Sequence, residues 1–250
     1  MSGPGENKSF WDHLEDLRGS LIKILAAVLV FTTLAFCFKE ILFKMVLAPK
    51  DSSFFMYKLF GGGDFNIQLM NIGLAEQFMI HLKTAFAFGV LMASPYIIYV
   101  LFDFIRPALY EKERQHSVGI VLSSYLMFLV GVAVNYLFIF PLTVRFLGTY
   151  QVSEQVSNML SLQSYMDTLL MMSLVFGIIF EIPVVSWLLA RFGLLKAEYM
   201  TRYRRHAIVA ILVVAAIITP TGDAFTLLIV SLPIWLLYEL SVVIVRRVNR

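Results

Sequence analysis

A carboxylate, Glu181, stands in the middle of a largely apolar stretch that covers about residues 166–190. It lies about nine residues, or ~14 Å along a helix, from the end of that stretch, close to the midplane of a ~30 Å hydrocarbon core. An acid at this depth costs a few kcal/mol on insertion scales, so such residues usually face protein or water and mark function. Pro183 removes one helical hydrogen bond, to the carbonyl of Ile179. Together they predict a polar notch beside a kink, with a structural hydrogen-bond anchor between helices as the alternative.

The N-terminal arm, residues 9–18, combines a helix start with an acidic face. Ser9 and Asp12 fit a capping box, which satisfies free amides at the start of a helix. Apolar residues then recur at helical spacing, which predicts an amphipathic turn that lies on the membrane and leads into the first span. The polar face carries Asp12, Glu15 and Asp16. Taken alone, these acids are explained by ordinary solvation at the interface.

The segment 105–116 carries a second group of acids. Pro107 biases Arg106 away from helical geometry, so we expect a span to end here and the chain to turn. Glu111 and Glu113 could bind cations, or could pair with the basic residues between and after them. From the residues alone, the ion pairs are favoured.

Two further acids lie near the C-terminal apolar segment. For Glu239 we expect a structural role, because Arg246 and Arg247 follow about two helical turns later. Asp223 is expected to be a turn residue, since Asx side chains favour turns. The four histidines do not recur at metal-ligand spacing, and motifs for nucleophilic catalysis or phosphate binding are missing. The sequence therefore predicts no catalytic residue, no metal site and no cofactor.

The elements that position these residues must be membrane helices. The 250 residues are 59% hydrophobic and 15% charged, whereas a soluble domain is about 45–50% apolar and about 25% charged. The single cysteine, Cys37, excludes an intramolecular disulfide framework and a thiolate metal site. The chain is therefore expected to be an integral membrane protein.

The distribution of basic residues predicts the topology. Apolar segments fall at about 21–38, 78–104, 117–141, 166–190, 207–218 and 224–245. Most of the 20 Lys and Arg residues fall in the N-terminal arm, in the loops at 105–116 and 191–206, and in the tail. Because basic residues mark the cytoplasmic side, both termini are predicted to be inside, with six crossings.

One segment fits this topology less simply than the others. Residues 207–218 make a helix of only ~18 Å, shorter than the ~20 residues of a normal span. We expect a short hairpin that turns outside at 219–223 and thins the bilayer or tilts against its neighbours; a re-entrant pair is the alternative. The outer loop at 39–77 is amphipathic in part and is expected to form a lid of short helices.

Several ordered motifs extend over nearly the whole chain. They are His13-Leu14 with Asp16-Leu17-Arg18, Ser94-Pro95 with Tyr99, Phe104-Ile105-x-Pro107-x-Leu109-Tyr110-x-x-Glu113-Arg114, Phe176-Gly177-x-x-Phe180-Glu181-x-Pro183, Thr219-Pro220 with Asp223, and Pro233 with Leu237-Tyr238-Glu239. In these motifs the chain resembles the TatC family, the multispanning receptor subunit of the Sec-independent twin-arginine protein translocase. The family's six spans and inside termini agree with the topology predicted above.

The resemblance implies a binding site for twin-arginine signal peptides on the cytoplasmic face. Carried over by position, its residues are Asp16, Glu113, Phe104, Leu109, Arg18 and Glu15. The chemistry fits, because guanidinium groups pair bidentately with carboxylates in strong, charge-assisted hydrogen bonds. This implication reverses the earlier preference for simple ion pairs in the 105–116 loop.

The resemblance also implies contacts within the membrane. Family members keep the membrane glutamate at Glu181, with proposed contacts to partner helices of the TatA and TatB type. Pro183, Asp223 and Glu239 are grouped with it as an intramembrane polar site.

The chain departs from the family pattern at some positions. The arm usually carries Glu where Asp16 stands, which shortens its reach by one methylene group and makes Glu15 a possible substitute. Family members often have glutamine where Leu227 stands, so a polar contact to a partner there is in doubt.

The sequence thus predicts an all-α polytopic protein, with residues 1–250 as one membrane domain of six transmembrane helices, the last two short. The predicted function is that of a receptor in the prokaryotic cytoplasmic (inner) membrane, without covalent chemistry. The resemblance implies that the protein binds twin-arginine precursors, recruits TatA- and TatB-type subunits and draws on the proton gradient. It is also expected to self-associate and to bind no nucleic acid. A small proton-coupled solute transporter that uses Glu181 as proton carrier is the alternative, and the absence of repeats and of paired broken helices counts against it. An intramembrane hydrolase is a weaker third interpretation, because no nucleophile sits beside a base within the spans.

Overall fold

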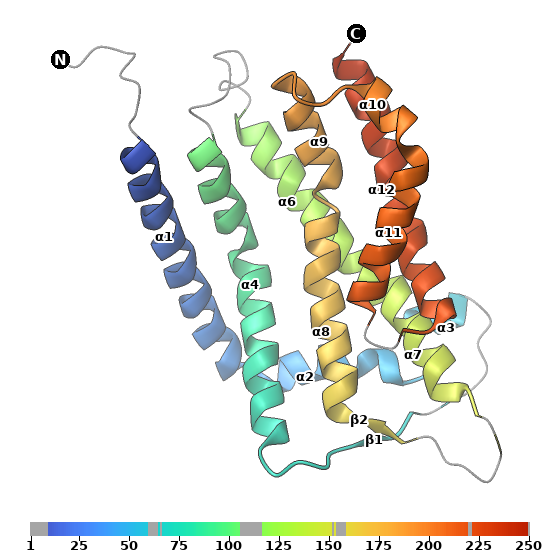
Figure 1. The fold of residues 1–250 in the computed structure, drawn as a ribbon. Coiled ribbons are helices and arrows are strands. Elements are labelled where there is room, and N and C mark those ends of the chain that lie inside the picture. The colour runs from blue at the N-terminus through green and yellow to red at the C-terminus, as the bar shows by residue number, and fades with distance from the viewer. Residues whose placement is uncertain are drawn as a thin grey trace.

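The computed structural model of the chain describes residues 10–59, 65, 67–105, 117–151, 153, 159–219 and 222–249. These residues form a bundle of long helices with short helices and a small strand pair at one end (Figure 1). The elements are α1 (Phe10–Cys37), α2 (Lys39–Leu47), η1 (Ala48–Lys50), α3 (Phe55–Leu59), β1 (Leu69–Met70), α4 (Glu76–Ile105), α6 (Ser117–Val134), η3 (Asn135–Ile139), α7 (Phe140–Thr149), β2 (Leu160–Ser161), α8 (Leu162–Ile179), α9 (Ile182–Arg191), α10 (Ala197–Arg202), α11 (Arg204–Ile218) and α12 (Ala224–Val248).

Five helical segments of the described chain are long and apolar enough to cross a membrane. They are Leu14–Cys37, Glu76–Ile105, Val118–Thr149, Leu162–Arg191 and Ala224–Val248. The segment predicted as the fifth span is α11, which has 15 residues and is ~22 Å long. It begins slightly before the predicted 207–218 and remains shorter than a normal span, so the count of six crossings stays a prediction.

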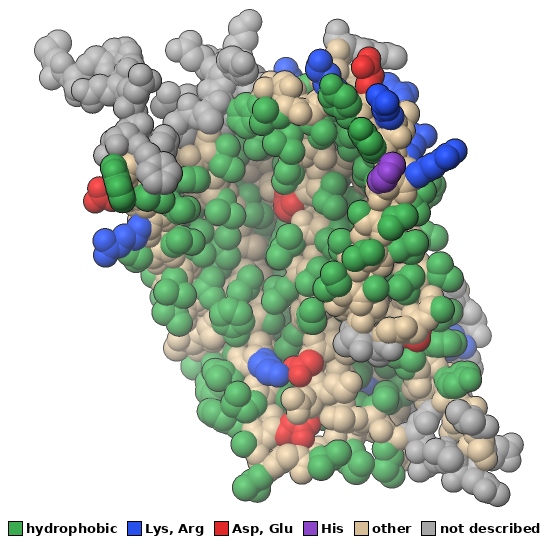
Figure 2. All heavy atoms as spheres, viewed as in Figure 1, with side chains coloured by type: hydrophobic (Ala, Val, Ile, Leu, Met, Phe, Trp, Pro, Cys, Tyr) green, Lys and Arg blue, Asp and Glu red, His purple; other side chains and the backbone are tan. Residues whose placement is uncertain are grey.

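The view in Figure 1 places the start of α1, the end of α4 and the end of α12 at the same end of the bundle. The opposite end carries α2 and the β1–β2 pair. If the basic segments are cytoplasmic, the first of these ends is the inner one and the second the outer one, and both words are used in this sense below. Figure 2 shows that hydrophobic side chains cover most of the visible face, with most charged side chains towards the two ends.

The third span is longer than predicted because it continues through a proline. Pro141 stands in the first turn of α7, where its missing N–H is tolerated. The π-helical segment η3, Asn135–Ile139, directly precedes this turn, and such a wide turn accommodates an interrupted hydrogen-bond ladder. The helix therefore runs on to Thr149 rather than ending at residue 141.

The outer end is held by tyrosine hydroxyls that bind backbone carbonyls of other elements. The hydroxyl oxygen of Tyr57, on α3, lies 2.7 Å from Pro49 O and 3.0 Å from Pro141 O. Burial raises the pKa of Tyr57. Tyr165 of α8 donates to Val46 O at 2.9 Å. The expected short helices of the outer loop are present as α2, η1 and α3, and these bonds fasten them to the spans.

The short parallel pair β1–β2 at the same end was not predicted. It joins Leu69 to Leu160 and Met70 to Ser161. β2 lies directly before α8, and β1 ends shortly before α4 begins at Glu76. The two-residue strands carry no alternating pattern long enough to be recognised. The pair brings the outer ends of α4 and α8 together.

Close helix packing depends on glycines at two crossings. A Cβ on Gly89 of α4 would lie 2.3 Å from Thr32 Oγ1 and 2.7 Å from Thr32 N on α1. A Cβ on Gly131 of α6 would lie 2.5 Å from Phe176 O on α8. Small residues at such crossings let backbones approach closely, which is a main source of helix association in lipid.

We predict that Gly89→Ala destabilises the protein by about 1–3 kcal/mol, because the added methyl group forces α1 and α4 apart. The matched control is Gly119→Ala in α6, where nothing lies within 4 Å of the added Cβ. The control is expected to be neutral or slightly stabilising. Unfolding midpoints in a mixed-detergent titration measure both variants, and equal midpoints would contradict the close α1–α4 contact.

Candidate functional site

Glu181 occupies a break between two helices and bonds to a third. It lies between the end of α8 at Ile179 and the start of α9 at Ile182. Ser124 of α6 donates a hydrogen bond from Oγ to Glu181 Oε2, while Glu181 Oε1 is buried without a hydrogen-bond partner. The carboxyl group therefore offers one unsatisfied acceptor in a low-dielectric region, where a matching donor is worth more than in water.

The predicted kink is confirmed, and its backbone bonds show how it forms. Glu181 N donates to Ile178 O at 3.0 Å, a tighter turn than the α-helical one, and Val185 N donates to Glu181 O at 2.9 Å to restart the ladder. Pro183 is buried in the first turn of α9, where a missing N–H is tolerated. The proline thus sets the position of the break, and the break leaves Glu181 between the two helical ladders.

Helix α6 packs closely against α8 because each helix has a glycine at the contact. A Cβ on Gly177 of α8 would lie 2.5 Å from Cε2 of the Phe128 ring, and Gly131 faces the backbone of Phe176. Glu181 consequently reaches a hydroxyl on α6 that is far from it in sequence. Ser124 could not be named from the sequence, because serines inside an apolar span give no periodic signal of their own.

The predicted signal-peptide residues lie at the inner end as far as the structure describes them. Glu15, Asp16 and Arg18 are exposed on the second and third turns of α1, and Phe104 is partly buried next to the last residue of α4. The ends of these two helices share one end of the bundle (Figure 1). Glu113 and Leu109, together with the predicted Ser9–Asp12 capping box, lie outside the described residues.

One acid at this end was missed. Asp103 is exposed, next to Phe104 and two residues before the end of α4 at Ile105. It stands at the boundary of an apolar segment, where a charge is common and draws no attention in a sequence. Its position nevertheless adds a carboxylate to the end of the bundle where guanidinium recognition is expected.

The predicted partner of Glu239 was wrong. Glu239 pairs with Arg204 of α11, whose Nη2 lies 2.7 Å from Oε2, rather than with Arg246 or Arg247. Two helical turns separate residues on one helix by ~11 Å, whereas the antiparallel neighbour α11 brings a guanidinium directly alongside. The expected structural role stands, and it joins α11 to α12.

Asp223 also has a structural contact. Its Oδ1 accepts from Thr226 N at 2.7 Å and caps the start of α12. This is the N-cap geometry that satisfies a free amide at a helix start. Asp223 and Glu239 therefore belong to the α11–α12 hairpin, and their bonds do not connect them to Glu181.

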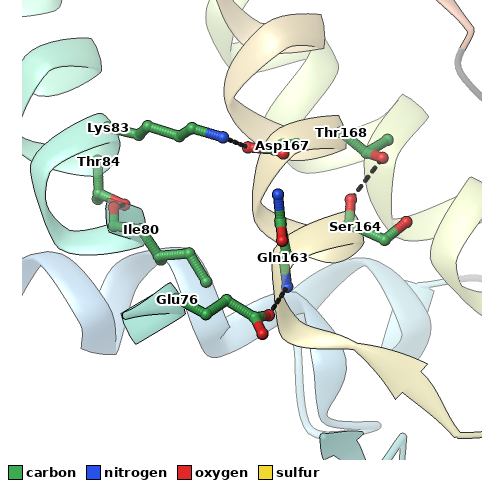
Figure 3. Close-up of polar contacts among 8 residues, drawn as sticks. All are labelled: Glu76, Ile80, Lys83, Thr84, Gln163, Ser164, Asp167 and Thr168. Carbon is green, nitrogen blue, oxygen red and sulfur yellow. Dashed lines mark hydrogen bonds and ion pairs between the residues drawn. The ribbon is translucent and has the colours of Figure 1, made fainter. Parts of the chain in front are cut away.

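A second polar contact within the spans was not predicted. Lys83 Nζ of α4 donates to Asp167 Oδ1 of α8 at 2.7 Å, and Glu76 Oε1 accepts from Gln163 N at 3.1 Å (Figure 3). Glu76 Oε2 also accepts from Gly73 N at 2.7 Å. The signal was present, because a charged residue inside a predicted span is a site hypothesis by default. Within the described residues, no group of three His, Cys, Asp or Glu side chains could hold a metal ion.

Comparisons with known proteins identify the family of this chain. Residues 12–233 match the model of the family described as Sec-independent protein translocase protein (TatC). The chain belongs to the TatC family. It is 31% identical to the TatC protein of Blattabacterium sp. subsp. Periplaneta americana, over 98% of this chain and 97% of that one. It is 33% identical to the TatC protein of Desulforapulum autotrophicum, over 97% of this chain and 86% of that one.

Solved structures agree with this membership. The crystal structure of the twin-arginine translocase receptor TatC superposes with a TM-score of 0.81 at 31% identity, covering 95% of this chain and 100% of that one. A second structure of that receptor, in the detergent DDM, gives a TM-score of 0.80. The TatC-family chain is thus a multi-pass membrane protein and a component of a Sec-independent protein translocase.

We predict that Ser124→Ala destabilises the protein by about 1 kcal/mol, because it leaves both oxygens of Glu181 without a donor. In a Glu181→Leu background the same change is expected to cost almost nothing, which a double-mutant cycle of unfolding midpoints measures. Ser123→Ala, on the exposed neighbouring position of α6, is the control. Equal costs of Ser124→Ala in both backgrounds would rule out the bond.

Proposed function

We propose that this chain is the receptor subunit that binds twin-arginine signal peptides at the cytoplasmic face and assembles with TatA- and TatB-type subunits. The assembled complex exports folded proteins across the prokaryotic inner membrane and uses the proton gradient. The observation that carries the proposal is the near-complete match to the TatC receptor structure, together with the carboxylates at the inner end of α1 and α4. Six crossings with both termini inside follow from the basic segments.

Recognition of the signal is assigned to the inner end of α1 and α4 and to the segment between α4 and α6. Asp16 is exposed there, and Glu113 belongs to the segment that leaves α4 at Ile105. Two separate carboxylates suit two adjacent guanidinium groups, since each pair forms parallel charge-assisted hydrogen bonds. Phe104 and Leu109 supply the apolar part of the site. Arg18 adds a positive charge to the arm, and Glu15 adds a negative one.

Recruitment of partner helices is assigned to Glu181. A transmembrane helix that carries a donor group could satisfy Glu181 Oε1, which is buried without a partner. Pro183 keeps the helix broken at this point. The Glu181 side chain as a whole is only partly buried, so a rotation of its carboxyl group would turn Oε1 towards a helix that packs against the side of the bundle. Asp223 and Glu239 support the neighbouring α11–α12 hairpin against which such a helix could pack, and the complex is expected to contain several copies of this chain.

For the signal site, we predict that Glu113→Ala lowers crosslinking to a twin-arginine signal peptide by about tenfold or more, and that Glu113→Lys abolishes it. The loss of one bidentate, partly desolvated pair is worth about 2 kcal/mol or more. Glu198→Ala removes another exposed acid, in α10, and serves as the control.

A signal peptide with Lys-Lys in place of Arg-Arg completes this test. It is expected to be captured poorly, because an ammonium group cannot form the bidentate pair. Unchanged crosslinking in Glu113→Lys, with normal membrane insertion, would overturn the receptor assignment.

For the membrane site, we predict that Glu181→Ala lowers export and partner assembly while signal-peptide crosslinking persists. Glu181→Gln is expected to keep most of the function, because an amide oxygen still accepts hydrogen bonds from Ser124 and from a partner. Export of a folded reporter and co-purification of the single-span subunits measure the effect. Equal failure of the Gln and Ala variants would instead favour a proton carrier, as the solute-transporter alternative requires.

A further inference from the structure

A groove of about 520 Å³ lies between α2, α4, α6 and α8. Its walls include Ala87 and Leu91 of α4, Ala133 of α6 and Leu170 of α8. This volume falls within the ~300–1,000 Å³ of typical ligand sites. A transmembrane helix, ~10 Å wide and ~30 Å long, is several times larger. The groove is therefore suited to a slender occupant.

The walls of the groove present apolar surface even where polar residues line it. The hydroxyl of Tyr136 donates to Met45 O at 2.7 Å, and Ser173 Oγ accepts from Asn135 Nδ2 at 2.9 Å. Both polar side chains thus have partners within the protein. An occupant of the groove must be apolar, since a polar one would lose its own hydrogen bonds.

The ion pair of Lys83 and Asp167 lies beside the outer end of this groove. Lys83 precedes Ala87 by four residues on α4, and Asp167 precedes Leu170 by three on α8, so each lies one turn outward on the helix face that lines the groove. The two side chains extend towards each other from α4 and α8 (Figure 3). They remain 45% and 42% exposed, so both can reach a further ligand.

The depth of the pair matches the headgroup region of the outer leaflet. The spans Glu76–Ile105 and Leu162–Arg191 have 30 residues each, and a hydrocarbon core requires ~20. A core centred on either span leaves about five residues, or ~8 Å, at each end. Lys83 and Asp167 then both fall at the outer boundary of the hydrocarbon, and the groove extends inward from them.

We propose that the groove and the ion pair together form a binding site for a phospholipid with a zwitterionic phosphoethanolamine headgroup. One acyl chain lies in the groove. The lipid phosphate accepts hydrogen bonds from the N–H groups of Lys83 that Asp167 does not use, and the lipid ammonium donates to Asp167. The pair has no net charge, so a purely anionic headgroup would gain from Lys83 but be repelled by Asp167. Asp167, at the headgroup end of this site, lies about 14 residues, or ~21 Å, from Glu181 along the α8–α9 segment. The site is independent of signal recognition at the inner end.

Lipid binding to the purified full-length chain tests the proposal. Native mass spectrometry in detergent compares phosphatidylethanolamine with phosphatidylglycerol of the same acyl chains. The wild type is expected to retain phosphatidylethanolamine about fivefold more strongly. Asp167→Asn should remove or reverse that preference, because only the cationic partner remains. Lys83→Gln should weaken retention of phosphatidylethanolamine.

The groove itself is tested with Ala133→Phe, which fills it from α6 and should reduce binding of both lipids. The control is Leu25→Phe on α1, which is 60% exposed and outside the groove. Asp167→Asn alters only a half-exposed side chain, so the headgroup test remains valid even if the Ala133→Phe variant misfolds.

Three outcomes would overturn the proposal. The first is equal retention of the two lipids by the wild type. The second is unchanged lipid binding in a folded Ala133→Phe variant. The third is the absence of retained lipid together with crosslinking of a photoreactive residue at position 133 to another protein, which would assign the groove to a partner helix.

Discussion

The fold depends on one constraint: backbone hydrogen bonds that break inside a membrane must be compensated within the protein. Pro183 leaves the carbonyl of Ile179 without its helical donor. As a result, α8 ends and α9 begins on either side of Glu181. Such a break is tolerated only where protein shields it from lipid. Gly131 provides that shield, since the absence of a side chain lets the backbone of α6 approach Phe176. The polar site therefore exists because α6 meets the α8–α9 helix at the place where that helix is interrupted.

The two ends of the bundle serve different purposes. At the outer end, Tyr57, Tyr165 and the β1–β2 pair tie the short helices and the starts of α4 and α8 together. These bonds satisfy backbone carbonyls that leave the helices, so the outer end is stabilised from within the chain. At the inner end, Glu15 and Asp16 are exposed on α1. The proposed signal-peptide site would use this asymmetry, because a rigid base can hold the helix ends at the geometry that a ligand requires.

Hydrophobicity and charge distribution were sufficient to place the long spans, because length and apolar content follow directly from the bilayer. The kink at Pro183 was also predictable, since it is a covalent property of proline. The contacts between helices were not. Ser124 bonds to a residue 57 positions away, and Glu239 pairs with Arg204 rather than with the basic residues later on its own helix. Both partners are determined by how the helices pack, and this packing cannot be read from a single sequence. Glu113 and Leu109 stay predictions, because they lie outside the described residues.

The polar residues of α8 explain why these contacts matter in lipid. Asp167 bonds to α4 and Glu181 bonds to α6, and the two acids lie about 14 residues, or ~21 Å, apart along the α8–α9 segment. Between helices in a bilayer, apolar contact alone gives little preference for one neighbour, because lipid tails are as apolar as leucine. Glu181 lies within the hydrocarbon and therefore requires a particular partner, since an unpaired polar group there is costly. Asp167 lies at the hydrocarbon boundary and is 42% exposed, so its ion pair favours α4 as the neighbour less strongly. Together, Glu181 and Asp167 favour one helix on each side of α8. The groove and the notch are consequences of that choice, because both lie where α8 faces the helices that its acids select.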